Sequence, residues 1–255
     1  MPVHPFLDAP LPLAIAHRGG SVNGTENTIA SFGRAVELGY RYLETDVRVT
    51  ADGELVVFHD GTVERVAGVE GRVQDLTWRE LSELRIGGRE PVPRLVEVLK
   101  TFPDARLLID PKCDAAVDPL IGCLRDHDAL DRVCVGSFSD RRLARMRAAF
   151  GSAICTSMGP RELLALRLAA WRWAPGSAVP TAPACVQMPV RYGPIVFAEP
   201  RCIAYAQARG LQVHVWTVND RPTMQRLLDL GVDGLITDEI TTLRALLEAR
   251  GAWHG

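Results

Sequence analysis

Short apolar segments typical of β-strands alternate with segments of helical periodicity along most of this chain. The strand-like segments lie at residues 13–17, 42–47, 55–59, 106–110, 132–136, 153–157, 185–188, 212–217 and 234–237. Helical patterns lie at 28–38, 94–101, 140–150, 161–170, 200–209, 222–230 and 241–249. Regular alternation of strand and helix indicates parallel strands, and about eight repeats indicate a sheet closed on itself. We therefore expect an α/β fold, a TIM (β/α)8 barrel.

One region departs from the alternation. The segments 42–47 and 55–59 are separated by a short stretch in which Asp52-Gly53 favours a tight turn, so we expect the second to return beside the first. Residues 61–93 are polar and rich in glycine, with one short helical pattern at 78–84. We expect a small insertion there, after the second strand region. A length of 255 residues suits one barrel, so residues 1–255 are expected to form a single domain.

Composition excludes several other classes. A formal net charge of -2, with arginines scattered along the chain, gives no sign of the clustered basic charge that nucleic-acid binding needs. The N-terminal stretch is broken by prolines and too short in its apolar run to be a signal peptide or a membrane span. Residues 163–174, with Trp171 and Trp173, fit a barrel helix better than a membrane-surface helix. The six cysteines show no CxxC spacing, so reduced thiols and a cytoplasmic location are expected.

Glu44 and Asp46 lie two residues apart in one strand-like run, YLETDVRV. Side chains at i and i+2 of a strand point to the same face, and two adjacent carboxylates repel each other unless a cation or a shared proton intervenes. A hard divalent cation such as Mg²⁺ or Ca²⁺ is the simplest neutraliser. The alternative is that one carboxylate pairs with Arg41 or Arg48.

Two histidines follow apolar runs, His17 in LAIAHRGG and His59 in LVVFHD. A histidine at a strand end is often only a core or rim residue, but these two accompany Arg18, the carboxylate pair and the ENT of residues 26–28. In RLLIDPK, Asp110 and Lys112 share a strand face in the same way. Pro111 between them lacks an N–H group, which indicates that the strand ends there.

The motifs AHRGG, ENTIASF, LETDV with TADGELVVFHD, VPRL, VGSF, VHVWTVND and GVDGLITD resemble, in this order, those of the glycerophosphodiester phosphodiesterase family. The resemblance extends from about Leu13 to about Leu247. It implies a barrel enzyme that uses a metal ion to hydrolyse glycerophosphodiesters to glycerol 3-phosphate and an alcohol. The partner is then a small-molecule substrate, without nucleic acid or a stable membrane span.

The resemblance also suggests roles for individual residues. From the proton transfers that a phosphodiester needs, we expect His17 and His59 to be the acid–base pair, with Glu44, Asp46 and Asp110 holding one divalent cation, Mg²⁺, Ca²⁺ or Mn²⁺. The family more often has Glu where Asp110 stands. We expect phosphate and substrate contacts from Arg18, Lys112, Trp216 and Asn219. Glu26 and Asn27 are expected to support the loop in which they lie. Asn27 also suits the N-cap of a helix from Thr28 onward, and Gln187 is a candidate polar contact.

Two other functions fit parts of the pattern. The same site could serve a lysophospholipase D or a cyclising phosphodiesterase acting on lipid substrates. A non-catalytic barrel that binds phosphodiesters is the third reading, although such modules tend to lose some of the catalytic residues. The sequence leaves the head group, the preferred cation and the oligomeric state open.

Overall fold

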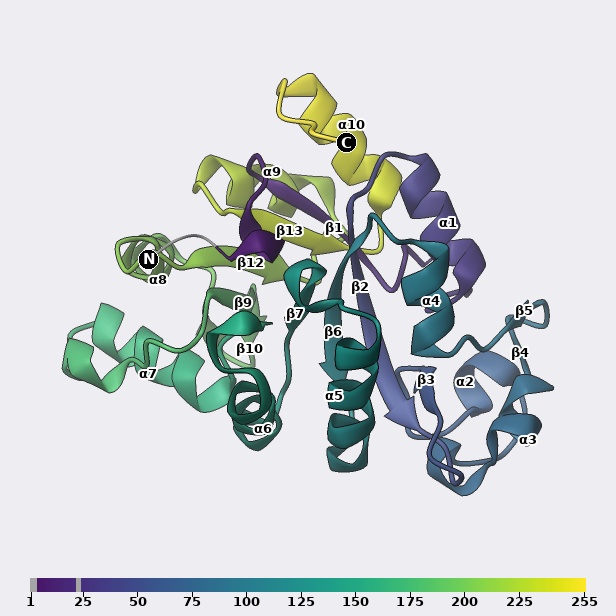
Figure 1. The fold of residues 1–255 in the computed structure, drawn as a ribbon. Coiled ribbons are helices and arrows are strands. Elements are labelled where there is room, and N and C mark those ends of the chain that lie inside the picture. The colour runs from purple at the N-terminus through teal and green to yellow at the C-terminus, as the bar shows by residue number, and fades with distance from the viewer. Residues whose placement is uncertain (1–3, 22–23) are drawn as a thin grey trace.

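The computed structural model describes residues 4–21 and 24–255, and its central sheet is a barrel of parallel strands (Figure 1). Neighbouring strands follow the order β8-β7-β6-β2-β1-β13-β12-β9. Their bounds are Leu13–His17 (β1), Tyr42–Val49 (β2), Arg106–Pro111 (β6), Val133–Val135 (β7), Cys155–Thr156 (β8), Cys185–Pro189 (β9), Gln212–Trp216 (β12) and Gly234–Thr237 (β13). The expectation of a TIM-type barrel is confirmed, and every predicted strand segment contains a strand.

The barrel closes between β8 and β9. Ser157 and Cys185 form a parallel bridge. The N–H of Ala184 donates to the carbonyl of Thr156 over 2.9 Å, and the N–H of Met158 donates to that of Cys185 over 3.0 Å. These bonds join the two ends of the strand order, so the interior of the sheet is enclosed.

Helices surround the barrel. The outer ones are Ile29–Glu37 (α1), Leu95–Thr101 (α4), Val117–Asp126 (α5), Asp140–Phe150 (α6), Pro160–Ala170 (α7), Pro200–Gln207 (α8), Arg221–Asp229 (α9) and Ile240–Ala249 (α10). Seven of them match predicted segments. The eighth, α5, was not predicted, because Pro119 and Gly122 interrupt its pattern. Short 3₁₀ turns lie at Pro5–Leu7 (η1), Asp114–Ala116 (η3), Leu130–Arg132 (η4), Gly151–Ala153 (η5) and Gly176–Ala178 (η6).

The second strand region carries the expected excursion. Leu55–Val57 (β3) pairs antiparallel with β2, after a turn in which Gly53 has φ of 91°. The insertion that follows holds Glu64–Ala67 (α2), Val73–Asp75 (η2), Trp78–Ser82 (α3) and the hairpin Arg85–Ile86 (β4) with Glu90–Pro91 (β5). The helix predicted at 78–84 is confirmed as α3, whereas α2 was not predicted, because it is only four residues long and too short to produce a periodic pattern. α2, α3, β4 and β5 lie together at one side of the barrel (Figure 1).

Apolar side chains form separate layers inside and outside the sheet. Those inside the barrel are Ile15, Tyr42, Leu108, Cys134, Cys155, Cys185 and Ile236, with Phe6 and Leu7 packed against them. The η1 turn closes the amino-terminal end, because the first residues of two strands bond to it. Tyr42 donates its hydroxyl to the carbonyl of Phe6, and Gln212 donates its amide to that of Leu7.

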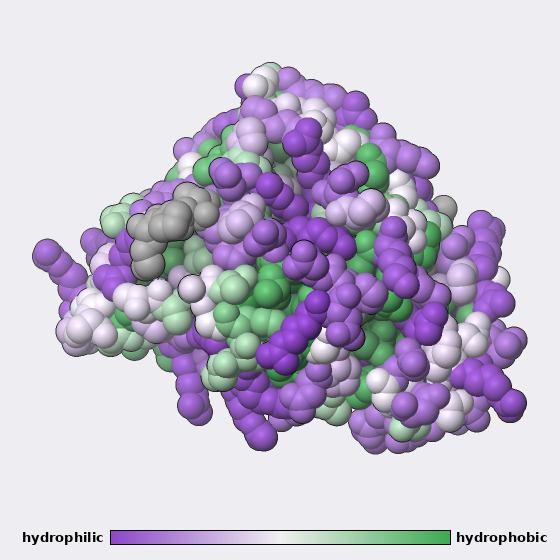
Figure 2. Space-filling model, in the orientation of Figure 1, coloured by the Kyte–Doolittle hydropathy of each residue, from purple (hydrophilic) through white to green (hydrophobic). Residues whose placement is uncertain are grey.

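The remaining pieces lie on the outside. A second small hairpin, Arg191–Tyr192 (β10) with Ile195–Val196 (β11), follows β9 and was not predicted. None of the helices in residues 4–21 and 24–255 has the length and apolar character to cross a bilayer. The surface seen in Figure 2 is mostly hydrophilic, with hydrophobic residues exposed chiefly near the middle of the view.

Candidate active site

The predicted site residues meet at the carboxyl-terminal end of the barrel. His17 ends β1, Asp110 lies near the end of β6 and Trp216 ends β12. A cavity of about 730 Å³ opens there. Its lining includes most of the predicted set, namely His17, Arg18, Glu44, His59, Asp110, Lys112 and Trp216. Active sites of such barrels occupy this end, where the strands deliver their last side chains.

The turn after β1 has an unusual backbone. Arg18, Gly19, Gly20 and Asn27 all have positive φ, at 53°, 82°, 80° and 54°. A Cβ on Gly19 would lie 2.7 Å from the backbone of Ser31, so only glycine allows the turn to approach α1 this closely. The turn directs the Arg18 N–H to Glu44 Oε2 at 3.1 Å.

Asp46 is fully buried and is the centre of a polar network. Its carboxylate lies 3.1 Å from Arg18 Nε and 2.8 Å from Lys112 Nζ, and it accepts a 2.9 Å hydrogen bond from the Asn27 amide. Burial alone would raise the pKa of Asp46, but the two cations outweigh it and hold that pKa below its ordinary value.

The alternative partners considered for the carboxylate pair make other contacts. Arg41 donates to the carbonyl of Gly255, and Arg48 donates to the carbonyl of His59. Arg48 therefore helps to fix the segment that carries His59, whereas the partners of Asp46 come from the turn after β1 and from beyond β6.

Nearby cations compensate the negative charge of Glu44 less than that of Asp46. It is buried, and its carboxylate lies 3.8 Å from His17 Nε2. Burial, followed by the negative charge of Asp46, raises the pKa of Glu44 to about 7. A bound cation would remove the repulsion that causes part of this shift.

Asp110 and Lys112 form the third part of the site. Lys112 Nζ lies 2.7 Å from Asp110 Oδ2, and burial raises the pKa of Asp110 despite this contact. Asp110 Oδ1 is buried without a hydrogen-bond partner, and Asp46 Oδ1 has only Lys112 Nζ beside it, at 2.8 Å. A donor set made of carboxylate oxygens fits a hard divalent cation. Lys112 Nζ contacts both Asp46 and Asp110 and lies between these two carboxylates.

His17 is oriented by a residue from the far end of the chain. Its Nδ1 lies 2.7 Å from Asp238 Oδ1. Because a carboxylate only accepts, Nδ1 carries the proton of this bond and Nε2 faces the cavity. Burial lowers the pKa of His17, but Glu44 and then Asp238 outweigh it, so the net shift is upward. Asn219 donates to Asp238 Oδ2 at 2.7 Å and holds that carboxylate in place.

His59 also has a carboxylate partner, but its pKa is shifted in the opposite direction. Its Nδ1 lies 2.6 Å from Asp60 Oδ1, which leaves Nε2 free. Burial lowers the pKa of His59 and dominates over the favourable charges of Asp46 and Asp60. The pKa values of the two histidines are therefore shifted in opposite directions, upward for His17 and downward for His59.

Glu26 and Asn27 support the site from behind. Glu26 Oε1 lies 2.9 Å from Arg18 Nη1 and 2.6 Å from Arg65 Nη2. Asn27 does not cap α1 as predicted. The N-cap is Thr28, whose side chain accepts from the N–H of Ser31, because Asn27 has positive φ and uses its side chain on Asp46 and Thr45.

One wall of the cavity is apolar. Trp216 packs edge-on against Phe138 with ring centroids 5.3 Å apart, and Phe138 remains 62% exposed. Further apolar members of the wall are Leu108, Met158, Leu163, Leu164, Pro189, Tyr192, Ile195 and Phe197. Gln187 also lines the cavity, and its Nε2 is buried without a hydrogen-bond partner.

Sequence reasoning missed three residues that position the predicted set: Asp238, Asp60 and Arg65. Asp60 was visible as the last residue of LVVFHD, and Asp238 as the last of GVDGLITD, directly after a strand. Arg65, which reaches Asp60 and Glu26 from α2, carried no sequence signal. Its contacts bring the insertion to the edge of the site.

Known proteins resemble this chain over nearly its whole length. The model of the glycerophosphoryl diester phosphodiesterase family matches residues 17–242. The "Probable glycerophosphodiester phosphodiesterase 2" of Mycobacterium tuberculosis is 37% identical, over 95% of this chain and 93% of its own. A glycerophosphodiester phosphodiesterase of Caldanaerobacter subterraneus is 32% identical, over 94% of this chain and 99% of its own.

A crystal structure from Silicibacter pomeroyi shows the same fold. It superposes with a TM-score of 0.79 at 24% identity, over 96% of this chain and 97% of its own. The barrel, the order of the motifs and the family match agree. The chain belongs to the glycerophosphoryl diester phosphodiesterase family.

Proposed function

We propose that this protein hydrolyses glycerophosphodiesters to glycerol 3-phosphate and an alcohol. One observation carries the proposal: His17 and His59, whose pKa values are shifted in opposite directions, line one cavity. The cationic side chains of Arg18 and Lys112 line the same cavity. A phosphodiester needs proton transfer at two oxygens and positive charge around its phosphate. The names of the two bacterial relatives above support the same substrate class.

In this proposal His59 is the general base and His17 the general acid. The neutral Nε2 of His59 takes the proton from the attacking oxygen, since burial lowers the pKa of His59. The Nε2–H of His17 protonates the leaving alcohol, since Glu44 and Asp238 together raise the pKa of His17. Arg18 and Lys112 face the phosphate oxygens.

Glu44, Asp46 and Asp110 are proposed to hold one divalent cation. The unpartnered Oδ1 of Asp110, the burial of Asp46 and the raised pKa of Glu44 support this assignment. When bound, the cation would neutralise phosphate charge as a Lewis acid. Mg²⁺, Ca²⁺ and Mn²⁺ all suit oxygen donors, and Lys112 would then turn from the carboxylates toward the phosphate.

The test is release of glycerol 3-phosphate from glycerophosphocholine by the purified protein, first in EDTA and then with each cation. We expect release only after a cation is restored. Absence of release with every cation would contradict the proposed substrate. Early products should also be examined for a cyclic glycerophosphate, which would mean that the substrate's own hydroxyl is the attacker rather than water.

The apolar wall favours a second candidate activity, hydrolysis of lysophospholipids. Glycerophosphocholine is small and polar and would leave Phe138, Leu164 and Tyr192, which are 62%, 47% and 71% exposed, in contact with water. An acyl chain would cover such side chains, at about 25 cal/mol for each Å² buried. In parallel assays, a higher kcat/KM for monomeric lysophosphatidylcholine than for glycerophosphocholine would favour this candidate, and the reverse order would dismiss it.

A further inference from the structure

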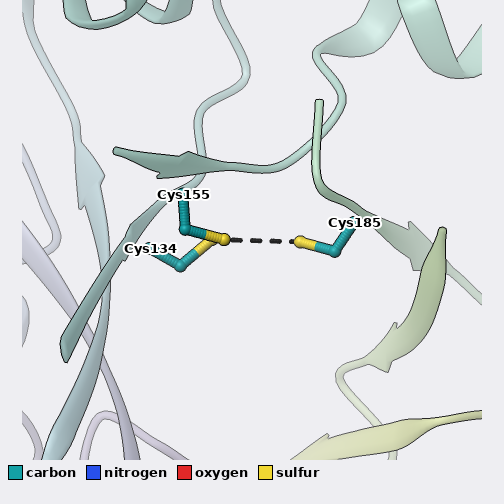
Figure 3. Close-up of side chains that lie close together, drawn as sticks. All are labelled: Cys134, Cys155 and Cys185. Carbon is teal, nitrogen blue, oxygen red and sulfur yellow. Dashed lines mark hydrogen bonds between the residues drawn. The ribbon is translucent and has the colours of Figure 1, made fainter. Parts of the chain in front are cut away.

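Three cysteines far apart in the sequence meet inside the barrel. Cys134 lies on β7, Cys155 on β8 and Cys185 on β9, and their side chains point toward one another (Figure 3). The sulfur atoms of Cys134 and Cys185 are 3.9 Å apart, and all three lie within 4.8 Å of one another. In residues 4–21 and 24–255, no other group of three His, Cys, Asp or Glu side chains is this tight.

The spacing is close to that of sulfur ligands on one metal ion. With Zn–S bonds of about 2.3 Å and tetrahedral angles, two sulfurs are separated by about 3.8 Å. All three cysteines are free and fully buried, and none of them lines the cavity of the candidate active site. Strands β7, β8 and β9 fix the three Cα positions, so the cluster is built by the fold rather than by a mobile loop.

His214, on the neighbouring strand β12, is a candidate fourth donor outside the tight group of three sulfurs. His214 on β12 is fully buried, and its Nδ1 has no hydrogen-bond partner. Strand β12 pairs with β9, and Cys185 lies opposite Gln212, two residues before His214. An unpartnered ring nitrogen in a closed interior is costly unless something occupies it.

The surroundings of His214 also fix which nitrogen is free. Gln212 donates its amide to the carbonyl of Leu7 at 3.0 Å, so its Oε1 is the atom that faces His214 Nε2 at 3.3 Å. Because an amide oxygen only accepts, Nε2 carries the proton and Nδ1 presents a lone pair. Metal-binding histidines are commonly held in this way, with the other N–H given to a carbonyl oxygen.

We propose that Cys134, Cys155, Cys185 and His214 form a zinc site inside the barrel. Three sulfurs and one nitrogen match the donor set of structural zinc sites. Zinc is favoured over Cu⁺ because the interior is otherwise apolar. With three thiolates and a neutral imidazole, Zn²⁺ leaves a net charge of −1 and Cu⁺ a net charge of −2, and burial of net charge is costly. On binding, Zn–S bonds form and the thiols release their protons to water.

The burial of all four donors implies that the ion enters during folding. The test is therefore to unfold the full chain in denaturant with a reductant and a chelator, and to refold it with or without Zn²⁺ in reductant. We expect one tightly held zinc per chain after removal of loose metal, and a higher unfolding midpoint than for the zinc-free protein. Refolding with Co²⁺ should give the thiolate charge-transfer band of tetrahedral cobalt.

The matched variants are Cys185→Ala and Cys202→Ala, because Cys202 is a buried cysteine outside the cluster. Cys185→Ala should lose the zinc or hold it at least 100-fold more weakly, and Cys202→Ala should keep it. If Cys185→Ala does not fold, X-ray absorption spectroscopy of the zinc-loaded wild type identifies the ligand atoms around the zinc. A shell of three sulfurs and one nitrogen supports the site. A shell of oxygen and nitrogen only, or no retained zinc, overturns it.

Discussion

His17 and Asp238, 221 residues apart in the chain, are joined by a 2.7 Å contact between Nδ1 and Oδ1. Strands β1 and β13 are neighbours in the barrel, so the first strand and the last bring a histidine and its orienting carboxylate together. The carboxylate fixes the ring orientation and helps raise the pKa of His17. Several measurable consequences follow from this contact and from the others around it.

Asp238→Asn should lower kcat by about 100-fold with little change in KM, because His17 loses its orientation. Removing this negative charge should also lower the pKa of His17, so the alkaline limb of the pH–rate profile should move to lower pH. Asp229→Asn is the control, since Asp229 forms only a surface ion pair with Arg250. An unshifted profile for Asp238→Asn would contradict the orienting role.

His17→Ala and His59→Ala should each lower kcat for glycerophosphocholine by about 10²- to 10⁴-fold while cation binding, measured by calorimetry, is retained. A glycerophosphodiester of p-nitrophenol separates the two roles, because this leaving group needs no proton. His17→Ala should then recover most of its activity, and His59→Ala should not. Equal impairment of both variants on this substrate would reject the acid and base assignment.

Glu44 should make the cation-free protein sensitive to pH. Its pKa is about 7 in the fold against an ordinary value of 4.5, so the folded state binds this proton more tightly than the unfolded state does. The stability from this group is complete below pH 4.5 and is lost as pH rises through 7, by at most about 3 kcal/mol.

Glu44→Gln should remove this pH dependence. Denaturant unfolding in EDTA between pH 5 and 8 should show wild type losing stability relative to Glu44→Gln as the pH rises. Added Ca²⁺ should restore wild type and leave the variant nearly unchanged. A constant difference across this pH range would show that Glu44 does not titrate as described.

Phe138→Ala should lower kcat/KM for monomeric lysophosphatidylcholine about tenfold or more, the effect of losing one buried aromatic side chain. Its effect on glycerophosphocholine should be within a factor of about two, since that substrate has no acyl chain to cover the ring. Trp173→Ala is the control, because Trp173 is 68% exposed and lies outside this cavity. Equal losses on both substrates would point to a general defect instead.

Gly19→Ala should destabilise the protein by at least about 1–3 kcal/mol, because Gly19 has φ of 82° and an added Cβ would collide with Ser31. Gly33→Ala, in α1 with free space around it, should be neutral or stabilising by up to about 1 kcal/mol. Chemical denaturation measures both. The inference about the turn after β1 fails if the two variants have the same stability.

Much of the barrel could be predicted because its signals are local. Strand segments such as 13–17 and 234–237 are short apolar runs between polar turns, and they match β1 and β13. The pairing of Glu44 with Asp46 on one face follows from the two-residue period of a strand. Helix α5 could not be predicted, because packing, rather than local helix propensity, keeps Pro119 and Gly122 in a helix.

The sequence by itself determined the alternation of strands and helices, the polar residues at the strand ends and the family to which the chain belongs. Only the tertiary structure decided which side chains meet, because closing the barrel places residues beside one another that are distant in the chain. The contact of His17 with Asp238 and the cluster of Cys134, Cys155 and Cys185 are of this kind. No local spacing encodes either, since each depends on the order and stagger of strands around the barrel.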